Sequence, residues 1–204
     1  MRRRTVTFVA GAVGVAAVGI ASFADRPLAE LAQAHPFRGS MEFYVLCRLT
    51  GYVPVWILVG AALGLIDIGR GWRTAWTRGG VLIVSVLLSG AAAELLKMVV
   101  RRERPAAPFT GYVFRPWAQD PWSSAGLGWP SSHVAVAFAA AWVLWRLHPR
   151  AWPVWILIGC ASAWSRLAFN DHYLSDVVGA AVLAYVVVKG VAAMPVGGAA
   201  ASRE

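Results

Sequence analysis

The amino-acid sequence predicts an all-α integral membrane protein, with six transmembrane helices in one bundle and both termini in the cytoplasm. Of its 204 residues, 58% are hydrophobic and only 14% are charged, and the mean hydropathy is +0.58. This composition is unusual for a soluble domain. The apolar residues also fall into six separate runs, and most of these are long enough to cross a bilayer as helices. A chain of this length is expected to form a single membrane-embedded domain, residues 1–204.

The first apolar run, residues 5–24, follows three consecutive arginines and is expected to form the first transmembrane helix within residues 1–24. A cleaved signal peptide is the alternative, because residues 22–24 have the small-x-small pattern of a cleavage site. The run has 20 residues, however, whereas the apolar core of a signal peptide has about 7–15. Its length therefore favours a helix that is retained.

Five further runs complete the predicted bundle: residues 49–69, 79–97, 133–147, 152–169 and 173–193. Pro54 is expected to kink the second span. The fourth run has only 15 residues and would rise roughly 22 Å as a helix. Because a hydrocarbon core is about 30 Å thick, the ends of this helix are expected to lie below the interface. The core of the domain is placed at about residues 50–193, and the small residues of 194–204 predict a disordered tail.

The distribution of charge sets the expected orientation. Six spans place both termini on one side, which carries ten of the 19 basic residues against two acidic residues, Asp67 and Glu204. By the positive-inside rule this side is cytoplasmic. The net charge of +9 is therefore interpreted as membrane topology and not as nucleic-acid binding, since no long basic tail is present. The two cysteines, Cys47 and Cys160, lack metal-ligand spacing, which argues against a zinc site or a disulfide framework.

The stretch between the last two runs, residues 165–176, has the most distinctive spacing. His172 and Asp176 are four residues apart, so on a helix their side chains share one face. The carboxylate can then orient the imidazole through one ring nitrogen and leave the other nitrogen free to attack. Arg166 precedes them with a planar fork that suits a phosphate or a carboxylate. For this stretch alone, a chance ionic cluster that caps the last helix is the alternative.

Two further polar clusters are expected on the same face of the membrane. Lys97 and Arg104 leave the third span, and an ionisable residue near the membrane is a functional candidate, although a lone lysine there is more often a snorkelling one. Ser131 and Ser132 open the fourth run after a proline, and the free N–H groups of such a first turn form an anion site. His133 follows them, where it could protonate a leaving oxygen.

Together these clusters resemble the signature of a known family. The pattern Lys97-x6-Arg104-Pro105, Pro130-Ser131-Ser132-His133 and Ser165-Arg166-x5-His172-x3-Asp176 resembles the three-part signature of the type 2 phosphatidic acid phosphatase superfamily. Ser132 stands where the family usually has glycine. The resemblance implies a six-helix bundle whose outer-face site hydrolyses lipid phosphate esters or anhydrides without a metal or other cofactor.

The resemblance also implies a role for each residue of the site. The groups that bind the phosphoryl oxygens would be Lys97, Arg104, Arg166, Ser131 and Ser132. His172 would attack phosphorus and form a phosphohistidine, while Asp176 holds its ring. His133 would protonate the departing oxygen and then activate water.

The implied substrate is a lipid phosphate whose tail stays in the bilayer, such as undecaprenyl diphosphate, phosphatidylglycerophosphate or phosphatidic acid. The implied location is the bacterial cytoplasmic membrane, with the site facing the periplasm or the cell exterior. A lipid A phosphatase and a lipid phosphotransferase are alternatives that would use the same residues. A small lipid transporter is the non-enzyme alternative, but its charges would be expected at mid-depth along several spans. Soluble vanadate-dependent haloperoxidases resemble the same motifs, but this chain is too hydrophobic for that class.

Overall fold

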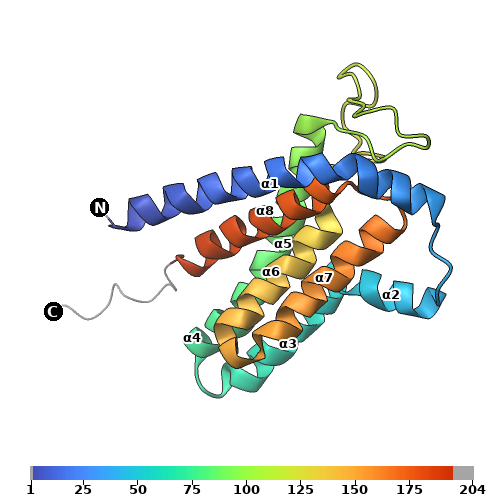
Figure 1. Ribbon diagram of the computed structural model, residues 1–204. Coiled ribbons are helices and arrows are strands. Elements are labelled where there is room, and N and C mark those ends of the chain that lie inside the picture. Colours follow the sequence, from blue (N-terminus) through green and yellow to red (C-terminus); the bar gives the residue numbers. More distant parts are fainter. Residues whose placement is uncertain (1, 195–204) are drawn as a thin grey trace.

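The computed structural model describes residues 2–194, with side chains from residue 11 onward, and shows a bundle of helices (Figure 1). The helices are α1 (Arg2–Ala34), α2 (Met41–Leu49), α3 (Val53–Ile68), α4 (Trp72–Ala75), η1 (Trp76–Gly80), α5 (Val81–Val100), α6 (Ser132–Leu147), η2 (Pro149–Ala151), α7 (Trp152–Ala168) and α8 (Leu174–Ala192). Among the described residues, β-pairing is limited to isolated bridges in the loop between α5 and α6. The predicted all-α class is confirmed. Residues 195–204 of the expected tail lie outside the described residues.

Helix α6 forms the centre of the bundle and contacts α5, α7 and α8 (Figure 1). Its buried positions are occupied mainly by small side chains: Ala135, Ala137, Ala139, Ala140 and Ala141. Small residues let neighbouring helices approach closely, which is how helices associate in a membrane. Helix α6 has 16 residues and rises about 24 Å, so the short fourth helix expected from the sequence is present.

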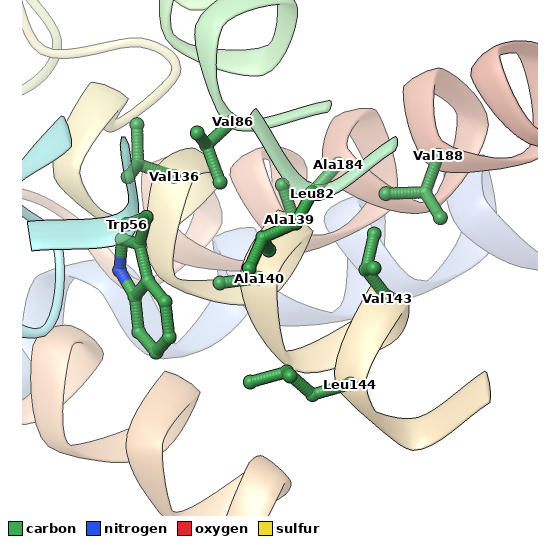
Figure 2. Close-up of a cluster of buried hydrophobic side chains, with 10 residues drawn as sticks. All are labelled: Trp56, Leu82, Val86, Val136, Ala139, Ala140, Val143, Leu144, Ala184 and Val188. Atoms are coloured by element: carbon green, nitrogen blue, oxygen red, sulfur yellow. The ribbon is translucent and has the colours of Figure 1, made fainter. Parts of the chain in front are cut away.

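A cluster of buried apolar side chains joins α6 to its neighbours (Figure 2). Its members come from α3, α5, α6 and α8: Trp56, Leu82, Val86, Val136, Ala139, Ala140, Val143, Leu144, Ala184 and Val188. Because protein interiors are close-packed and resist small displacements, this cluster fixes the helices relative to one another. It therefore also fixes the ends of α5, α6 and α8, where the candidate site residues lie.

Within the described residues, three helical segments are long and apolar enough to cross a membrane: Gly11–Ala34, Trp72–Val100 and Leu174–Ala192. A fourth is obtained if α2 and α3, which meet at an angle of 56°, are counted as one bent span. The length and the apolar composition of these segments are those of a helical membrane protein. All six predicted runs are helices in the structure, whereas six complete crossings and cytoplasmic termini stay predictions.

Two details of the first spans differ from the sequence-based expectation. The first helix does not end near residue 24 but continues to Ala34, with Pro27 inside it. Pro54 does not kink the second span, because it lies in the first turn of α3. Its missing N–H has no intrahelical partner to lose at that position. The bend falls before it, between α2 and α3.

The helix ends that carry the predicted motifs meet at one end of the bundle (Figure 1). This end comprises the last turns of α5 and α7, the first turns of α6 and α8, and the loop 101–131. The C-terminal half of α1 crosses the beginning of α8 there, and α1 and α8 are in contact. The first turns of α1 and the last turns of α8 extend away from this end, to the left in Figure 1.

Candidate active site

A buried histidine–aspartate pair lies at the beginning of α8. His172 Nδ1 is 3.3 Å from Asp176 Oδ2, and the two residues are 4% and 0% exposed. His172 stands in the turn after α7, and Asp176 stands in the first turn of α8. Asp176 Oδ2 also accepts a hydrogen bond from the Tyr173 N–H at 2.8 Å, which caps the helix and fixes the carboxylate. The pair expected from the four-residue spacing is therefore present.

The surroundings of His172 favour its neutral form. Burial lowers the pKa of His172 below its ordinary value, because removal from water penalises the imidazolium, and the Asp176 carboxylate opposes part of this shift. The positive charges of Lys97 and Arg104 act in the same direction as burial. With Nδ1 directed at the carboxylate, the ring proton belongs on Nδ1, and Nε2 keeps its lone pair. The arrangement presents a neutral imidazole that can act as a nucleophile.

Two arginines of the predicted site converge on one carboxylate. Arg166 Nη1 is 3.0 Å from Asp171 Oδ2, and Arg104 Nη1 is 3.4 Å from Asp171 Oδ1. Arg166 is only 3% exposed and also donates a hydrogen bond to Tyr44 Oη, in α2, at 2.7 Å. Guanidinium groups suit the planar oxygens of carboxylates and phosphates. The two arginines can therefore bind a common anion.

Lys97, in the last turn of α5, contacts the first residue of α6. Its Nζ donates a hydrogen bond to Ser132 Oγ at 3.0 Å and lies 2.8 Å from Glu94 Oε1. The preceding Ser131 donates its N–H to the Asp176 carbonyl oxygen at 3.2 Å. Among the described residues, the buried Ser131 Oγ has no hydrogen-bond partner. This hydroxyl and the Lys97 ammonium are thus polar groups that a ligand could use at the α5–α6 junction.

His133, the second residue of α6, lines a groove of about 200 Å³ together with Arg48 and Tyr52. Its ring lies close enough to Arg166 and His172 for electrostatic interaction with both side chains. His133 therefore belongs to the same charged end of the bundle as the His172 pair. A proton donor and acceptor at this position can serve a group that is bound between the two histidines.

A larger cavity, of about 460 Å³, reaches His172 from the side of α1 and α7. Most of the side chains that line it are apolar: Leu28, Leu31, Phe37, Trp164, Leu167 and Leu174. Apolar surface of this kind suits the hydrocarbon part of a ligand. The buried imidazole thus has a mainly apolar cavity on one side and a charged cluster on the other.

The structure adds three residues that sequence reasoning missed: Arg102, Asp25 and Tyr112. Arg102, which is 7% exposed, pairs with the second oxygen of Asp176. Asp25 of α1 is 1% exposed and accepts a hydrogen bond from Tyr112 Oη at 2.8 Å. One signal in the sequence could have pointed to Asp25, since an acidic residue beside an apolar run is a functional candidate. In the described part of the chain, no three His, Cys, Asp or Glu side chains are grouped to hold a metal ion.

Fold and site together define a class of protein: a helical membrane protein whose cationic side chains gather near a buried histidine–aspartate pair. The chain belongs to the PAP2 superfamily, whose sequence model matches residues 78–197 and so includes all the predicted site residues. The chain is also similar to the decaprenylphosphoryl-5-phosphoribose phosphatase of Mycolicibacterium smegmatis, with 32% identity over 123 residues. This similarity covers 60% of the chain and 61% of the relative, which is less than two thirds of the relative's length. No solved structure matches the chain.

Proposed function

We propose that this protein is a lipid phosphatase, which hydrolyses a phosphate monoester or diphosphate of a membrane lipid through a phosphohistidine on His172. One observation carries the proposal: a buried imidazole, oriented by Asp176, lies beside arginines that already bind an anionic side chain. Membership of the PAP2 superfamily supports this reading of the site. Nucleophile, orienting carboxylate and anion-binding groups are the parts that such a reaction requires.

In the proposed complex, the phosphoryl group takes the place of the Asp171 carboxylate between Arg104 and Arg166. The Lys97 ammonium and the hydroxyl groups of Ser131 and Ser132 bind further phosphoryl oxygens. These groups neutralise the charge that spreads over the oxygens in the transition state. The chain's own cations thereby supply the stabilisation that a metal ion gives in other phosphatases, and we propose that no cofactor is needed.

The proposed chemistry has two steps. In the first, His172 Nε2 attacks phosphorus, the bond from phosphorus to the leaving oxygen breaks, and His133 gives that oxygen a proton. Asp176 stabilises the positive charge that develops on the imidazole ring. In the second step His133 takes a proton from water, the resulting hydroxide attacks phosphorus, and the P–N bond breaks to release phosphate. The negative charge of the bound phosphoryl group offsets the nearby arginines and favours the protonated form of His133 before the first step.

The apolar cavity beside His172 supports a substrate whose tail is hydrocarbon. The M. smegmatis relative, a decaprenylphosphoryl-5-phosphoribose phosphatase, favours a polyprenyl-linked phosphate over the glycerolipid phosphates. We propose undecaprenyl diphosphate or a phosphorylated polyprenyl-linked group as the first candidates. We place the site at the outer face of the bacterial cytoplasmic membrane, because the positive-inside distribution assigns the opposite end of the bundle to the cytoplasm.

Phosphate release from a panel of lipids tests this function. The panel contains decaprenylphosphoryl-5-phosphoribose, undecaprenyl diphosphate, phosphatidylglycerophosphate, phosphatidic acid and a lipid A phosphate, each presented in detergent with excess chelator. We expect release by the wild type and by His148→Ala, a control at the far end of α6, and none by His172→Ala. The ranking of kcat/KM then identifies the substrate class.

Two results would contradict the proposal. Folded wild-type protein that releases phosphate from no lipid would favour the phosphotransferase or the transporter. Release that is lost in chelator and restored by magnesium would overturn the proposed metal independence.

A further inference from the structure

Asp25 is an almost completely buried carboxylate on α1, outside the segment that matches the PAP2 superfamily. One of its oxygens, Oδ1, accepts the Ser175 N–H at 2.8 Å. The other, Oδ2, accepts the Ser175 hydroxyl and the Tyr112 hydroxyl, the latter at 2.8 Å, and lies 4.0 Å from Arg102 Nη1. A buried carboxylate is costly unless it is paired and hydrogen-bonded. Asp25 therefore meets the conditions under which a buried charge is retained.

Arg102 connects Asp25 to the histidine–aspartate pair. Its Nη2 donates hydrogen bonds to Ser175 Oγ, at 2.8 Å, and to Asp176 Oδ1. The guanidinium carbon lies 4.9 Å from the centre of the Tyr112 ring and 5.2 Å from that of Tyr173, which limits its movement. One guanidinium thus lies between two carboxylates. Its charge is shared between Asp25 and the aspartate that orients His172.

Asp25 also acts on the backbone of α8. The first N–H groups of a helix have no partner within that helix, and Asp25 binds the N–H of Ser175, the residue next to Asp176. A carboxylate at this end of a helix also interacts favourably with the helix dipole. Asp25 consequently fixes, from another helix, the turn in which Asp176 lies.

Tyr112 completes this arrangement from the loop between α5 and α6. Burial, with the hydrogen bond to Asp25, raises the pKa of Tyr112 to about 12. The phenol therefore stays protonated at neutral pH and donates its hydrogen to Asp25. Through Tyr112, Asp25 ties the loop to α1 and α8 at the point where Arg102 leaves α5.

We propose that Asp25 is a positioning residue of the active site, which holds Arg102 and the first turn of α8 so that Asp176 points at His172 Nδ1. The site would then need α1 as well as the segment that carries the three motifs. This inference rests on the proposed function, because its test measures the rate of phosphate release. Asp25 itself does not reach the reacting atoms, so its removal is expected to lower kcat and to leave KM nearly unchanged.

The test compares Asp25→Asn with Asp67→Asn, using the panel lipid that the wild type hydrolyses with the highest kcat/KM. Asp67 is a matched control, because it is 0% exposed and pairs with Arg70 and Arg78 at the other end of the bundle. We expect Asp25→Asn to lower kcat by about 10- to 100-fold, as is typical for residues that orient a reacting group. KM should stay within about threefold, and Asp67→Asn should keep the wild-type kcat even if its Tm falls.

A double variant separates positioning from a general structural role. If Asp25 acts through Asp176, then Asp25→Asn/Asp176→Asn should have the kcat of Asp176→Asn alone, within about twofold. A double variant whose kcat is lowered by the product of the two single reductions would overturn the inference. A folded Asp25→Asn with wild-type kcat would overturn it as well. Phosphate release by His172→Ala would instead overturn the proposed function, so the two failures are distinguishable.

A smaller change keeps the inference testable if Asp25→Asn does not fold. Tyr112→Phe removes a single hydroxyl group that donates to Asp25. We expect its kcat to fall about 3- to 10-fold, consistent with the loss of one ordinary intramolecular hydrogen bond, with KM unchanged. A wild-type kcat in folded Tyr112→Phe would then contradict the proposed role.

Discussion

Arg166 and Asp171 form an ion pair, with 3.0 Å between Nη1 and Oδ2, and the same carboxylate also reaches Arg104. An acidic side chain of the protein therefore lies where the two guanidinium groups are proposed to bind a phosphoryl group. The Asp171 side chain is 27% exposed, so it can turn toward water when a stronger anion arrives. The ion pair keeps the arginines oriented and at the same time competes with the substrate.

Replacing Asp171 tests this competition. In Asp171→Asn the competing charge is gone, so we expect KM for the lipid phosphate, and the inhibition constant of inorganic phosphate, to fall about 3- to 10-fold. That change corresponds to the loss of a partly exposed ion pair. Asp120→Asn, in the exposed part of the loop between α5 and α6, is the control and should leave both constants unchanged. A higher KM in Asp171→Asn would show that Asp171 supports substrate binding instead.

Asp176→Asn isolates the orienting role of the carboxylate. The amide keeps the size of the side chain, but it loses the charge that pairs with Arg102 and that stabilises the His172 imidazolium. We expect kcat to fall by about 10²- to 10⁴-fold, the range found when a catalytic histidine loses its carboxylate partner or its proton-transfer role. Size-exclusion chromatography and Tm would show that the variant is folded. A kcat within threefold of the wild type would remove Asp176 from the mechanism.

The acid limb of the pH dependence of kcat/KM reports the protonation of His172. Its pKa is lowered from the ordinary value of 6.5 by burial. The neutral imidazole is the nucleophile, so activity should persist as the pH falls through 6.5 and decline only when the pH reaches the lower pKa of the folded protein. In Asp176→Asn the carboxylate that raises this pKa is gone, and the decline should shift to still lower pH. Measurements between about pH 4.5 and 8 would contradict this if the acid limb had its midpoint at or above 6.5.

The sequence was sufficient to predict the six apolar helical runs, but it missed α2 and ended the first helix near residue 24 instead of Ala34. The fourth run was expected at residues 133–147, and α6 spans Ser132–Leu147. The pairing of His172 with Asp176 was expected from helical spacing, but His172 lies in the turn before α8, and the pair forms because Asp176 in the first turn of the helix faces back toward that turn. Helices that are encoded by runs of apolar residues could therefore be predicted from the sequence alone. The PAP2 superfamily match confirms the family that the three motifs indicated.

The rest of the site depends on contacts between distant segments. Asp25 and Ser175 are separated by 150 positions, and no periodicity relates them. From the sequence alone, Arg102 could equally be a solvent-exposed charge. Only the folded structure, in which the loop after α5 packs against α8, shows that Arg102 pairs with Asp176. The bend between α2 and α3 was misplaced at Pro54. A proline is tolerated in the first turn of a helix, so the chain bends before Pro54 and not at it.

A search for the phosphohistidine on His172 tests the proposed mechanism directly. The protein would be mixed with a substrate labelled with ³²P in the phosphoryl group, quenched in alkali, where phosphohistidine is stable, and digested for mass spectrometry. We predict label on His172 in the wild type, and neither label nor turnover in His172→Ala. Turnover by folded His172→Ala, or label on another residue in the wild type, would contradict the central claim.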